Sequence, residues 1–438
     1  MISSDVYQNL IDSIDATTSV GKVVQCIGLI VKAKCGLASI GEICEISLSS
    51  SSNKVVLAEV IGFDSSAILL MPYYGSKRIT QGDTVKATGK MAKVKVSDSL
   101  IGRVIDAFGN PLDTAPQLNN LVDIPLHKDV QNPLKREPIV EAISTGIKAI
   151  DGFVTIGKGQ RLGLMAGSGV GKSVLLSSIC KQVDADINVV ALIGERGREV
   201  EEFVSTTLGE EGLKNSIVIA ATAQDSPLVR IQAAYSAIAI SEYFAAKGKN
   251  VFLTMDSITR LATALREVGL AAGEPPTVKG YTPSVFSILP DLIERCGNFK
   301  NIGSITAIFT VLVESDDFND PVVDCVRAIL DGHIVLTREL AEKSHYPAID
   351  ISKSISRLYH QINNKEVISS AARLKKIFID YQQNKDILEL NLFDTGDSSK
   401  RDELSSSWQK LELFLKQEID ESLSLNDTRQ QLLALKEE

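Results

Sequence analysis

Long hydrophobic runs are missing from the 438-residue sequence. No stretch approaches the ~18 to 20 uninterrupted apolar residues that a membrane-spanning helix needs. The first residues, Met1 to Asp5, also lack the basic region and the apolar block of a secretory signal. We therefore expect a soluble, cytoplasmic protein.

An excess of positive charge is missing as well. Lysine and arginine number 46 against 55 aspartates and glutamates, which gives a formal net charge of −9. Proteins that bind DNA or RNA backbones usually show the opposite balance, so we expect no nucleic-acid partner. The 44% hydrophobic and 23% charged residues exclude a mostly disordered chain, and the length allows roughly three domains.

Metal-ligand patterns are missing among the six cysteines. They contain no C-x-x-C pair and have no nearby histidine partner, so neither a zinc site nor a disulfide framework is predicted. A chain of this length can bury large cores without either. The cysteines are Cys26, Cys35, Cys44, Cys180, Cys296 and Cys325.

Two segments with different patterns make up the first part of the chain. Residues 1–20 carry aliphatic side chains at helical spacing with aspartates between them, which predicts a short amphipathic helix. This helix would pack either on a partner or on its own domain. Residues 21–93 contain short apolar or β-branched runs between Gly, Ser, Asn and Asp, and predict a small β-barrel. The expected strands are Val23–Val31, Val55–Phe63, Ala67–Met71 and Thr84–Thr88.

The pattern then changes to alternating strands and helices. Residues 94–145 are rich in Pro and Asp and predict a wrapping connection, whereas residues 146–360 predict a parallel sheet covered on both faces. We group residues 94–360 as one domain and predict a helical C-terminal domain over residues 361–438. The expected sheet strands are Arg161–Ala166, Val189–Ile193, Ile217–Ala221, Val251–Met255 and Ile305–Val313.

A phosphate-binding loop stands between an apolar strand and a helix. Three glycines let successive backbone N–H groups turn toward a phosphate, and the helix N-terminus adds partial positive charge. Lys172 can reach the β and γ phosphates, and the Ser173 hydroxyl can bind Mg²⁺. A glycine-rich turn with an incidental lysine is the weaker alternative in this context. The candidate nucleotide-binding residues are Gly167, Ser168, Gly169, Val170, Gly171, Lys172, Ser173 and Val174.

Two acidic residues follow other predicted strands. Asp256 ends an apolar run and is a candidate to hold a water of the Mg²⁺ shell, although buried strands also end in Asp at ordinary turns. Glu195 follows another run and could polarise the water that attacks a γ-phosphate. The alternative for Glu195 is a solvent-exposed charge cluster with Arg196, Arg198 and Glu199.

Three stretches resemble the ATPases of type III protein secretion, in their flagellar-export and injectisome versions. They are Ala166–Ser173, Gly194–Val200, and the run from Asp316 through Asp331–Leu336 to His345–Asp350. The resemblance is dense over about residues 90–360. This family is similar to the catalytic subunits of rotary ATP synthases. It implies an α/β fold with a small N-terminal β-barrel, a RecA-like parallel-sheet P-loop domain and a helical C-terminal domain.

The resemblance also implies roles for individual residues. Glu195 matches the water-activating glutamate, and Arg196 matches the neighbour that contacts the γ-phosphate region. Arg357 matches an arginine finger that reaches into the site of the adjacent subunit. Tyr346 matches the aromatic that stacks on adenine, and Phe414 is assigned to the same pocket.

The function implied by the resemblance is ATP hydrolysis by a homohexamer, with ATP and Mg²⁺ as ligands. The ring would lie in the cytoplasm at the inner face of the inner membrane, near the export gate, and would release export substrates from chaperones and unfold them. The implied partners are a stator protein on the N-terminal helix, a central stalk protein, and chaperone–substrate complexes.

Three alternatives stay open. A catalytic subunit of a rotary ATP synthase typically carries Thr where this chain has Ser173 and Gly197. A non-catalytic ring subunit typically carries an amide where this chain has Glu195. A hexameric RNA translocase is disfavoured by the acidic balance and by the lack of a basic, aromatic RNA-binding domain.

Overall fold

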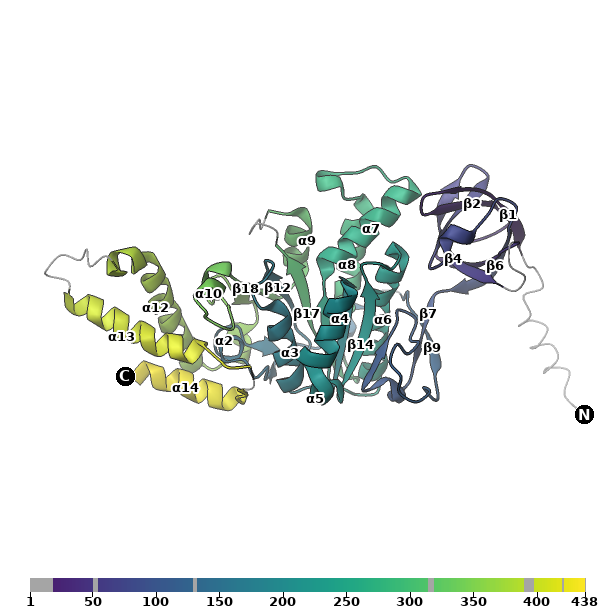
Figure 1. Cartoon of the computed structure of the whole chain (residues 1–438). Coiled ribbons are helices and arrows are strands. Elements are labelled where there is room, and N and C mark those ends of the chain that lie inside the picture. Colours follow the sequence, from purple (N-terminus) through teal and green to yellow (C-terminus); the bar gives the residue numbers. More distant parts are fainter. Residues whose placement is uncertain are drawn as a thin grey trace, which may run out of the picture.

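The computed structural model describes residues 19–49, 54–128, 132–313, 319–389, 398–419 and 421–437. Most of the predicted N-terminal helix and the Asp316–Asp317 motif lie outside these residues. A β-barrel stands at one end of the molecule, a helix-covered sheet occupies the middle, and a helical unit stands at the other end (Figure 1). Within the described ranges, no helix is both long and apolar enough to cross a membrane.

The barrel confirms the predicted architecture but differs in its strands. The expected strand over residues 23–31 is a hairpin that turns at Gly28, whose φ is 58°. Glu42–Ser47 was not predicted because Cys44 and Ile46 alternate with partly exposed residues and form no apolar run. The barrel closes in the order β1-β2-β5-β4-β3-β6. Its strands are β1 Val20–Ile27, β2 Ile30–Lys34, β3 Glu42–Ser47, β4 Val55–Asp64, β5 Ala67–Pro72 and β6 Thr84–Met91.

The segment 94–145 is more than the wrapping connection that the sequence predicted. Its strand β8 (Arg103–Ile105) pairs in parallel with β14 (Ser216–Thr222) at the edge of the central sheet. Arg103 in β8 donates from Nε to Asp113 at 3.0 Å, which fixes the following loop against the strand. The short elements here are β7 Lys93–Val96, η2 Asp98–Leu100, β8 Arg103–Ile105, β9 Val122–Pro125, η3 Pro133–Lys135 and β10 Ala142–Ile143. Outside this segment, η1 Ser76–Arg78 lies between β5 and β6, and β11 Ile156–Gly157 pairs with β10.

The central sheet contains all five predicted strands and runs in the order β19-β18-β12-β17-β15-β13-β14-β8. Only β19 and the side strand β16 are antiparallel to their neighbours. Successive side chains of β13 pack into two different hydrophobic cores, one on each face of the sheet, because side chains of a strand alternate between the two faces. The strands are β12 Arg161–Ala166, β13 Ile187–Glu195, β14 Ser216–Thr222, β15 Val251–Asp256, β16 Gly297–Asn298, β17 Ser304–Leu312, β18 Gly332–Leu336 and β19 Ile355–Ser356.

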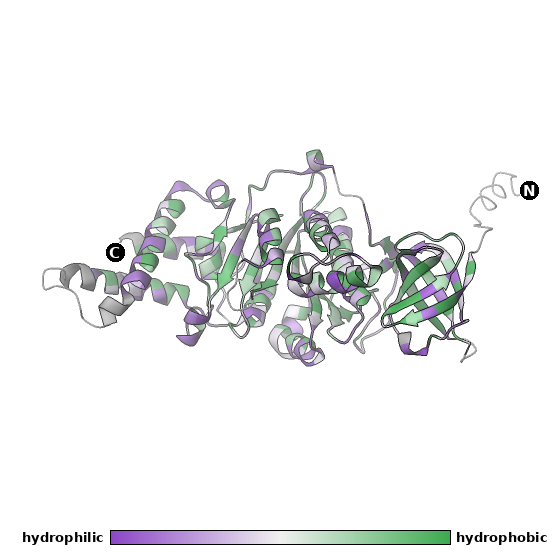
Figure 2. Cartoon of the chain, turned by 90° about the horizontal axis from the view of Figure 1, so that it is seen from above, coloured by the Kyte–Doolittle hydropathy of each residue, from purple (hydrophilic) through white to green (hydrophobic). Residues whose placement is uncertain are grey.

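Helices cover both faces of this sheet, and the hydrophobic strands lie between them (Figure 2). One π-helical turn, η4 Phe203–Leu208, joins α4 to α5. The helices are α2 Lys148–Phe153, α3 Lys172–Gln182, α4 Gly197–Glu202, α5 Gly209–Leu213, α6 Pro227–Ala246, α7 Ile258–Ala272, η5 Val278–Gly280, α8 Pro283–Glu294, α9 Pro321–Ile329, α10 Arg338–Glu342 and α11 Tyr359–Ile362.

The C-terminal unit is helical, as predicted. Helices α12 Lys365–Glu389, α13 Ser398–Leu415 and α14 Leu425–Glu437 pack around Phe378 and Leu411. The Trp408 ring stacks on Tyr381 with centroids 4.3 Å apart. The same core continues into α2 and the strand β12, so the unit is attached directly beside the start of the phosphate loop.

Candidate active site

The phosphate loop has the backbone geometry that its glycines predict. It leaves β12 after Ala166 and enters α3 at Lys172, with Gly171 as the N-cap residue. Gly169 and Gly171 have φ values of 79° and 86°, a region that residues with a Cβ rarely adopt. The loop therefore needs glycine at these two positions for conformational reasons.

Lys172 and Asp256 meet at the carboxyl edge of the sheet. The Lys172 ammonium donates to Oδ1 of Asp256, and Thr310 Oγ1 donates to the same oxygen at 2.7 Å. Asp256 is buried at the end of β15, and Thr310 lies on the adjacent strand β17. The carboxyl ends of parallel strands share one edge, so tertiary structure brings together residues that lie 84 positions apart.

Glu195 lies at the same edge, as the last residue of β13. Burial and the negative charge of Asp256 raise its pKa to about 7, while Lys172 opposes the rise. The register pairs Leu192 with Asp256, so β13 extends past Asp256 toward the phosphate loop. A carboxyl group with this pKa is half ionised near neutral pH and can accept a proton there.

The remaining predicted loop residues differ in exposure. Ser168, Ser173 and Val174 are exposed, whereas Val170 is buried. Arg196 lies at the surface, where its guanidinium donates to Glu199 at 3.0 Å. The two interpretations therefore apply to different residues. Glu195 lies near Asp256 and Lys172, whereas Arg196 pairs with Glu199 in a surface charge cluster.

A cavity of about 670 Å³ opens beside the loop. Its lining includes Gly171, Val174 and Tyr346, and also Leu413 and Gln417 from the C-terminal unit. A Cβ placed on Gly171 would lie 3.5 Å from the Tyr346 ring, so the ring covers the start of α3. Half-exposed Tyr346 thus presents an aromatic face to the cavity, as stacking on a base requires.

Phe414 does not line this cavity, contrary to the sequence-based assignment. Its ring is buried against Phe153, with centroids 6.2 Å apart. The adjacent Leu413, 75% exposed, lines the cavity instead. Neighbouring side chains of α13 point in different directions. The packing of α13 on α2 decides that Phe414 points into the core and Leu413 into the cavity.

Gln417 is a site residue to which sequence reasoning gave no role. Its backbone N–H donates to the carbonyl of Tyr346 at 2.9 Å, and its side chain donates to the carbonyl of Gly146 at 2.7 Å. Its side-chain oxygen accepts from the N–H of Lys148 at 2.8 Å. No local motif marks such a residue, because its partners come from two distant segments.

Arg357 lies at the amino ends of the parallel strands, opposite the carboxyl ends where the phosphate loop begins. It follows β19, and its N–H donates to the carbonyl of Asp331 at 2.9 Å, just before β18. The five residues of β18, at about 3.3 Å each, place it roughly 16 Å from the edge where the phosphate loop begins. The exposed Arg357 therefore cannot act on the phosphate loop of its own chain.

The oxygen donors at the loop suit a hard divalent cation. Ser173 offers a hydroxyl and Asp256 a carboxylate, the ligand types that Mg²⁺ accepts. Among the described residues, no group of three His, Cys, Asp or Glu side chains could hold a metal.

Comparisons with known proteins identify the relatives of this chain. Residues 146–356 match the nucleotide-binding domain of the ATP synthase alpha/beta family, and residues 23–89 match its beta-barrel domain. Residues 363–434 match the T3SS EscN ATPase C-terminal domain. The flagellum-specific ATP synthase of Bacillus subtilis is 49% identical over 98% of both chains. That of Salmonella typhimurium is 42% identical over 98% of this chain and 96% of its own.

Solved structures give the same result. The assembled ATPase EscN from the type III secretion system of enteropathogenic E. coli superposes with a TM-score of 0.87 at 41% identity, covering 95% of this chain and 99% of EscN. EscN in complex with its central stalk EscO gives a TM-score of 0.86 at 40% identity over the same shares. This chain belongs to the flagellar and type III secretion ATPases of the ATP synthase alpha/beta family.

Proposed function

We propose that this chain hydrolyses ATP with Mg²⁺ as the export ATPase of a flagellar type III secretion apparatus. The observation that carries the proposal is Glu195, whose pKa is raised to about 7 beside the Lys172–Asp256 pair. An acid in this position favours turnover over structural nucleotide binding. The flagellum-specific relatives, at up to 49% identity over 98% of both chains, support the flagellar form of the apparatus.

The residues of the loop would act in a defined order. The backbone N–H groups between Gly167 and Lys172 bind the phosphates of ATP, and the Lys172 ammonium moves from Asp256 to the γ-phosphate. Ionised Glu195 orients a water and accepts its proton as the water oxygen attacks the γ-phosphorus. The bond from the γ-phosphorus to the oxygen that bridges it to the β-phosphate breaks, and ADP and phosphate are released. Ser173, and Asp256 through a water, would hold Mg²⁺, which would supply positive charge to the phosphate oxygens.

The position of Arg357 supports a ring with sites between subunits. Since Arg357 lies at the far edge of its own sheet, it would act on the γ-phosphate held by a neighbour. Arginine fingers supplied in trans contribute about 10³ to 10⁵ in rate. Arg196, exposed beside Glu199, would turn toward the same γ-phosphate region. We propose a homohexamer, and the assembled state of EscN supports an oligomer.

Among the wider assignments, the central stalk has a counterpart in a solved relative. We propose a central stalk partner, as in the EscN–EscO complex, a stator protein on residues 1–20, and chaperone–substrate complexes at the C-terminal unit. We place the ring in the cytoplasm at the inner membrane, near the export gate, where it would release and unfold substrates. The proposed domains are residues 1–20, 21–93, 94–360 and 361–438.

The test is steady-state ATP hydrolysis across a protein concentration series, with Mg²⁺. Turnover per chain should rise as the ring assembles, and Glu195→Gln should bind ATP without turnover. Glu201→Gln, an exposed neighbour on α4, is the matched control and should keep full activity. If the wild-type protein binds ATP and hydrolyses none in any assembly state, the chain is a nucleotide-stabilised structural subunit instead.

A further inference from the structure

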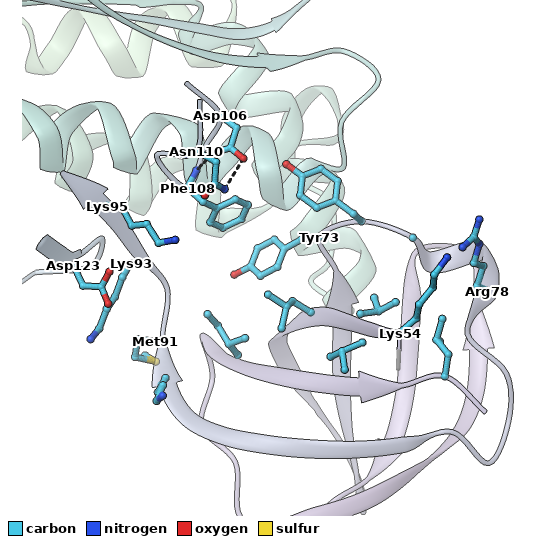
Figure 3. A pocket seen from close by; sticks show the side chains of 18 of the residues that line it. Lys54, Tyr73, Arg78, Met91, Lys93, Lys95, Asp106, Phe108, Asn110 and Asp123 are labelled. Carbon is cyan, nitrogen blue, oxygen red and sulfur yellow. Dashed lines mark hydrogen bonds between the residues drawn. The ribbon is translucent and has the colours of Figure 1, made fainter. Parts of the chain in front are cut away.

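A second cavity, of about 1160 Å³, lies where the barrel meets the connection to the central sheet. Figure 3 shows its residues converging from the barrel strands and the β7–β9 ladder. Tyr73 and Phe108 meet at its inner end, with ring centroids 5.0 Å apart. None of the residues in the proposed ATP site lines this cavity, so its role is separate from catalysis.

The cavity is strongly basic. Two carboxylates face six cations there, and one of the two, Asp106, already accepts hydrogen bonds from Phe108 and Asn110. Within the described part of the chain, no ion pair joins any of these six cations to a carboxylate. In a protein of net charge −9 this produces a local positive field that attracts an acidic ligand. The cations are Lys54, Lys77, Arg78, Lys90, Lys93 and Lys95.

The floor of the cavity is apolar. Val55 and Leu57 lie two residues apart on one face of β4 and line the cavity together with Tyr74 and Met91, and each of the four is about half exposed. A contiguous exposed apolar patch with a charged rim marks a site that binds a protein segment. A small anion would satisfy the cations and leave this floor uncovered. The fitting ligand is an acidic amphipathic peptide segment.

Residues 1–18 of this chain have that chemistry. Their side chains include Asp5, Asp12 and Asp15 and no lysine or arginine, and aliphatic residues recur at helical spacing. The aliphatic residues are Val6, Leu10, Ile11 and Ile14. As a helix, 18 residues would span about 27 Å, enough to lie along a cavity of this size.

The path of the chain leads toward the cavity. The Ser19 carbonyl accepts from the N–H of Ala87, and β1 runs antiparallel to β6. The polypeptide therefore enters β1 from the end of β6 that carries Lys90. Ser19 also lines a hollow of about 740 Å³ that shares Ile43 and Lys90 with the basic cavity.

We propose that residues 1–18 dock in the basic cavity of their own chain, with the aspartates against the cations and the aliphatic face on the apolar floor. The docked segment is unavailable to other proteins. A partner that binds residues 1–18, such as the stator of the proposed function, therefore competes with the cavity. The docking itself does not depend on ATP hydrolysis.

The test is zero-length carbodiimide coupling of the full-length protein, which joins carboxylates to lysine amines in contact, followed by peptide mass spectrometry. We expect coupling of Asp5, Asp12 or Asp15 to cavity lysines. Coupling to Lys54 and Lys90 should fall at least fivefold in Lys93→Glu/Lys95→Glu and in about 1 M salt, which shortens the Debye length to about 3 Å. The charge reversal Lys181→Glu/Lys214→Glu, at exposed lysines outside the cavity, is the matched control and should leave coupling unchanged.

Mixing unlabelled with ¹⁵N-labelled protein distinguishes the occupants. Coupled peptides of uniform isotope composition, without mixed-isotope pairs, support docking within one chain. Mixed-isotope pairs in the proportion that random pairing of the labelled and unlabelled chains gives would mean that a second copy fills the cavity, and the proposal would be wrong. Absence of coupling to the cavity lysines, or coupling spread equally to Lys181 and Lys214, would also overturn it. None of these outcomes depends on whether the protein hydrolyses ATP.

Discussion

The ammonium of Lys172 and the carboxylate of Asp256 form an ion pair at the carboxyl edge of the central sheet, and Thr310 donates to the same carboxylate oxygen. We expect Asp256→Asn to lower kcat for ATP hydrolysis by about 10²-fold or more, because the charge that holds Mg²⁺ through water is lost. Thr310→Val removes only the neutral hydrogen-bond donor and should lower kcat far less. Equal losses in the two variants would contradict the role given to Asp256.

The pKa of Glu195 gives a pH dependence of activity. Because the proposed base must be ionised and its pKa is raised to about 7 by burial and by Asp256, kcat/KM should rise with pH through about 7 and then level off. Glu195→Gln should lower kcat about 10²- to 10⁴-fold and remove this rise. Steady-state rates between about pH 5.5 and 9 provide the measurement. A flat wild-type profile over that range would exclude Glu195 as the base.

The same pKa predicts a pH dependence of stability. A carboxyl whose folded pKa lies above its ordinary value of 4.5 contributes stability that is complete below 4.5 and is lost as pH rises through about 7. Glu195→Gln should therefore raise the urea midpoint relative to wild type at pH 8, with little difference at pH 4.5. Glu201→Gln, on an exposed side chain, should show no such dependence. The opposite sign would mean that Glu195 is ionised and stabilising in the folded protein.

The opposite-edge position of Arg357 predicts complementation between inactive variants. Arg357→Ala retains Glu195, and Glu195→Gln retains Arg357, so a mixed ring contains some complete sites between neighbouring chains. We expect each variant alone to lose about 10²-fold or more in turnover and the mixture to recover measurable activity. A finger acting within its own chain would give no recovery at any mixing ratio.

The positive φ of Gly171 predicts that a substitution there strains the backbone of the phosphate loop without removing a catalytic side chain. Alanine at this left-handed position costs about 1–2 kcal/mol and should weaken ATP binding, because the strain distorts the N–H groups that face the phosphates. Gly197 is the matched control, since its φ is not positive and an added Cβ there meets nothing within 4 Å. Calorimetric ATP affinity and urea midpoints of both alanine variants provide the test. Equal behaviour would show that the loop tolerates a Cβ.

The sequence alone determined the order of barrel, sheet and helices, because binary patterning and turn residues are local properties of the chain. It also marked Lys172, Glu195 and Asp256, since a phosphate loop and acids at strand ends can be recognised without their neighbours. It missed β3, where Glu42 and Glu45 interrupt the apolar pattern, and β8, which is only three residues long.

Tertiary structure decided which of these residues meet. The pKa of Glu195 depends on the field of Asp256. The lining of the cavity beside the phosphate loop depends on α13 packing on α2, which buries Phe414 and turns Leu413 outward. The end of the sheet at which Arg357 lies follows from the direction of β18 and its antiparallel pairing with β19. Each of these properties depends on several residues that are distant in sequence, so no local pattern encodes it. The basic cavity is of the same kind, because its cations come from separate strands and loops that only the fold brings together.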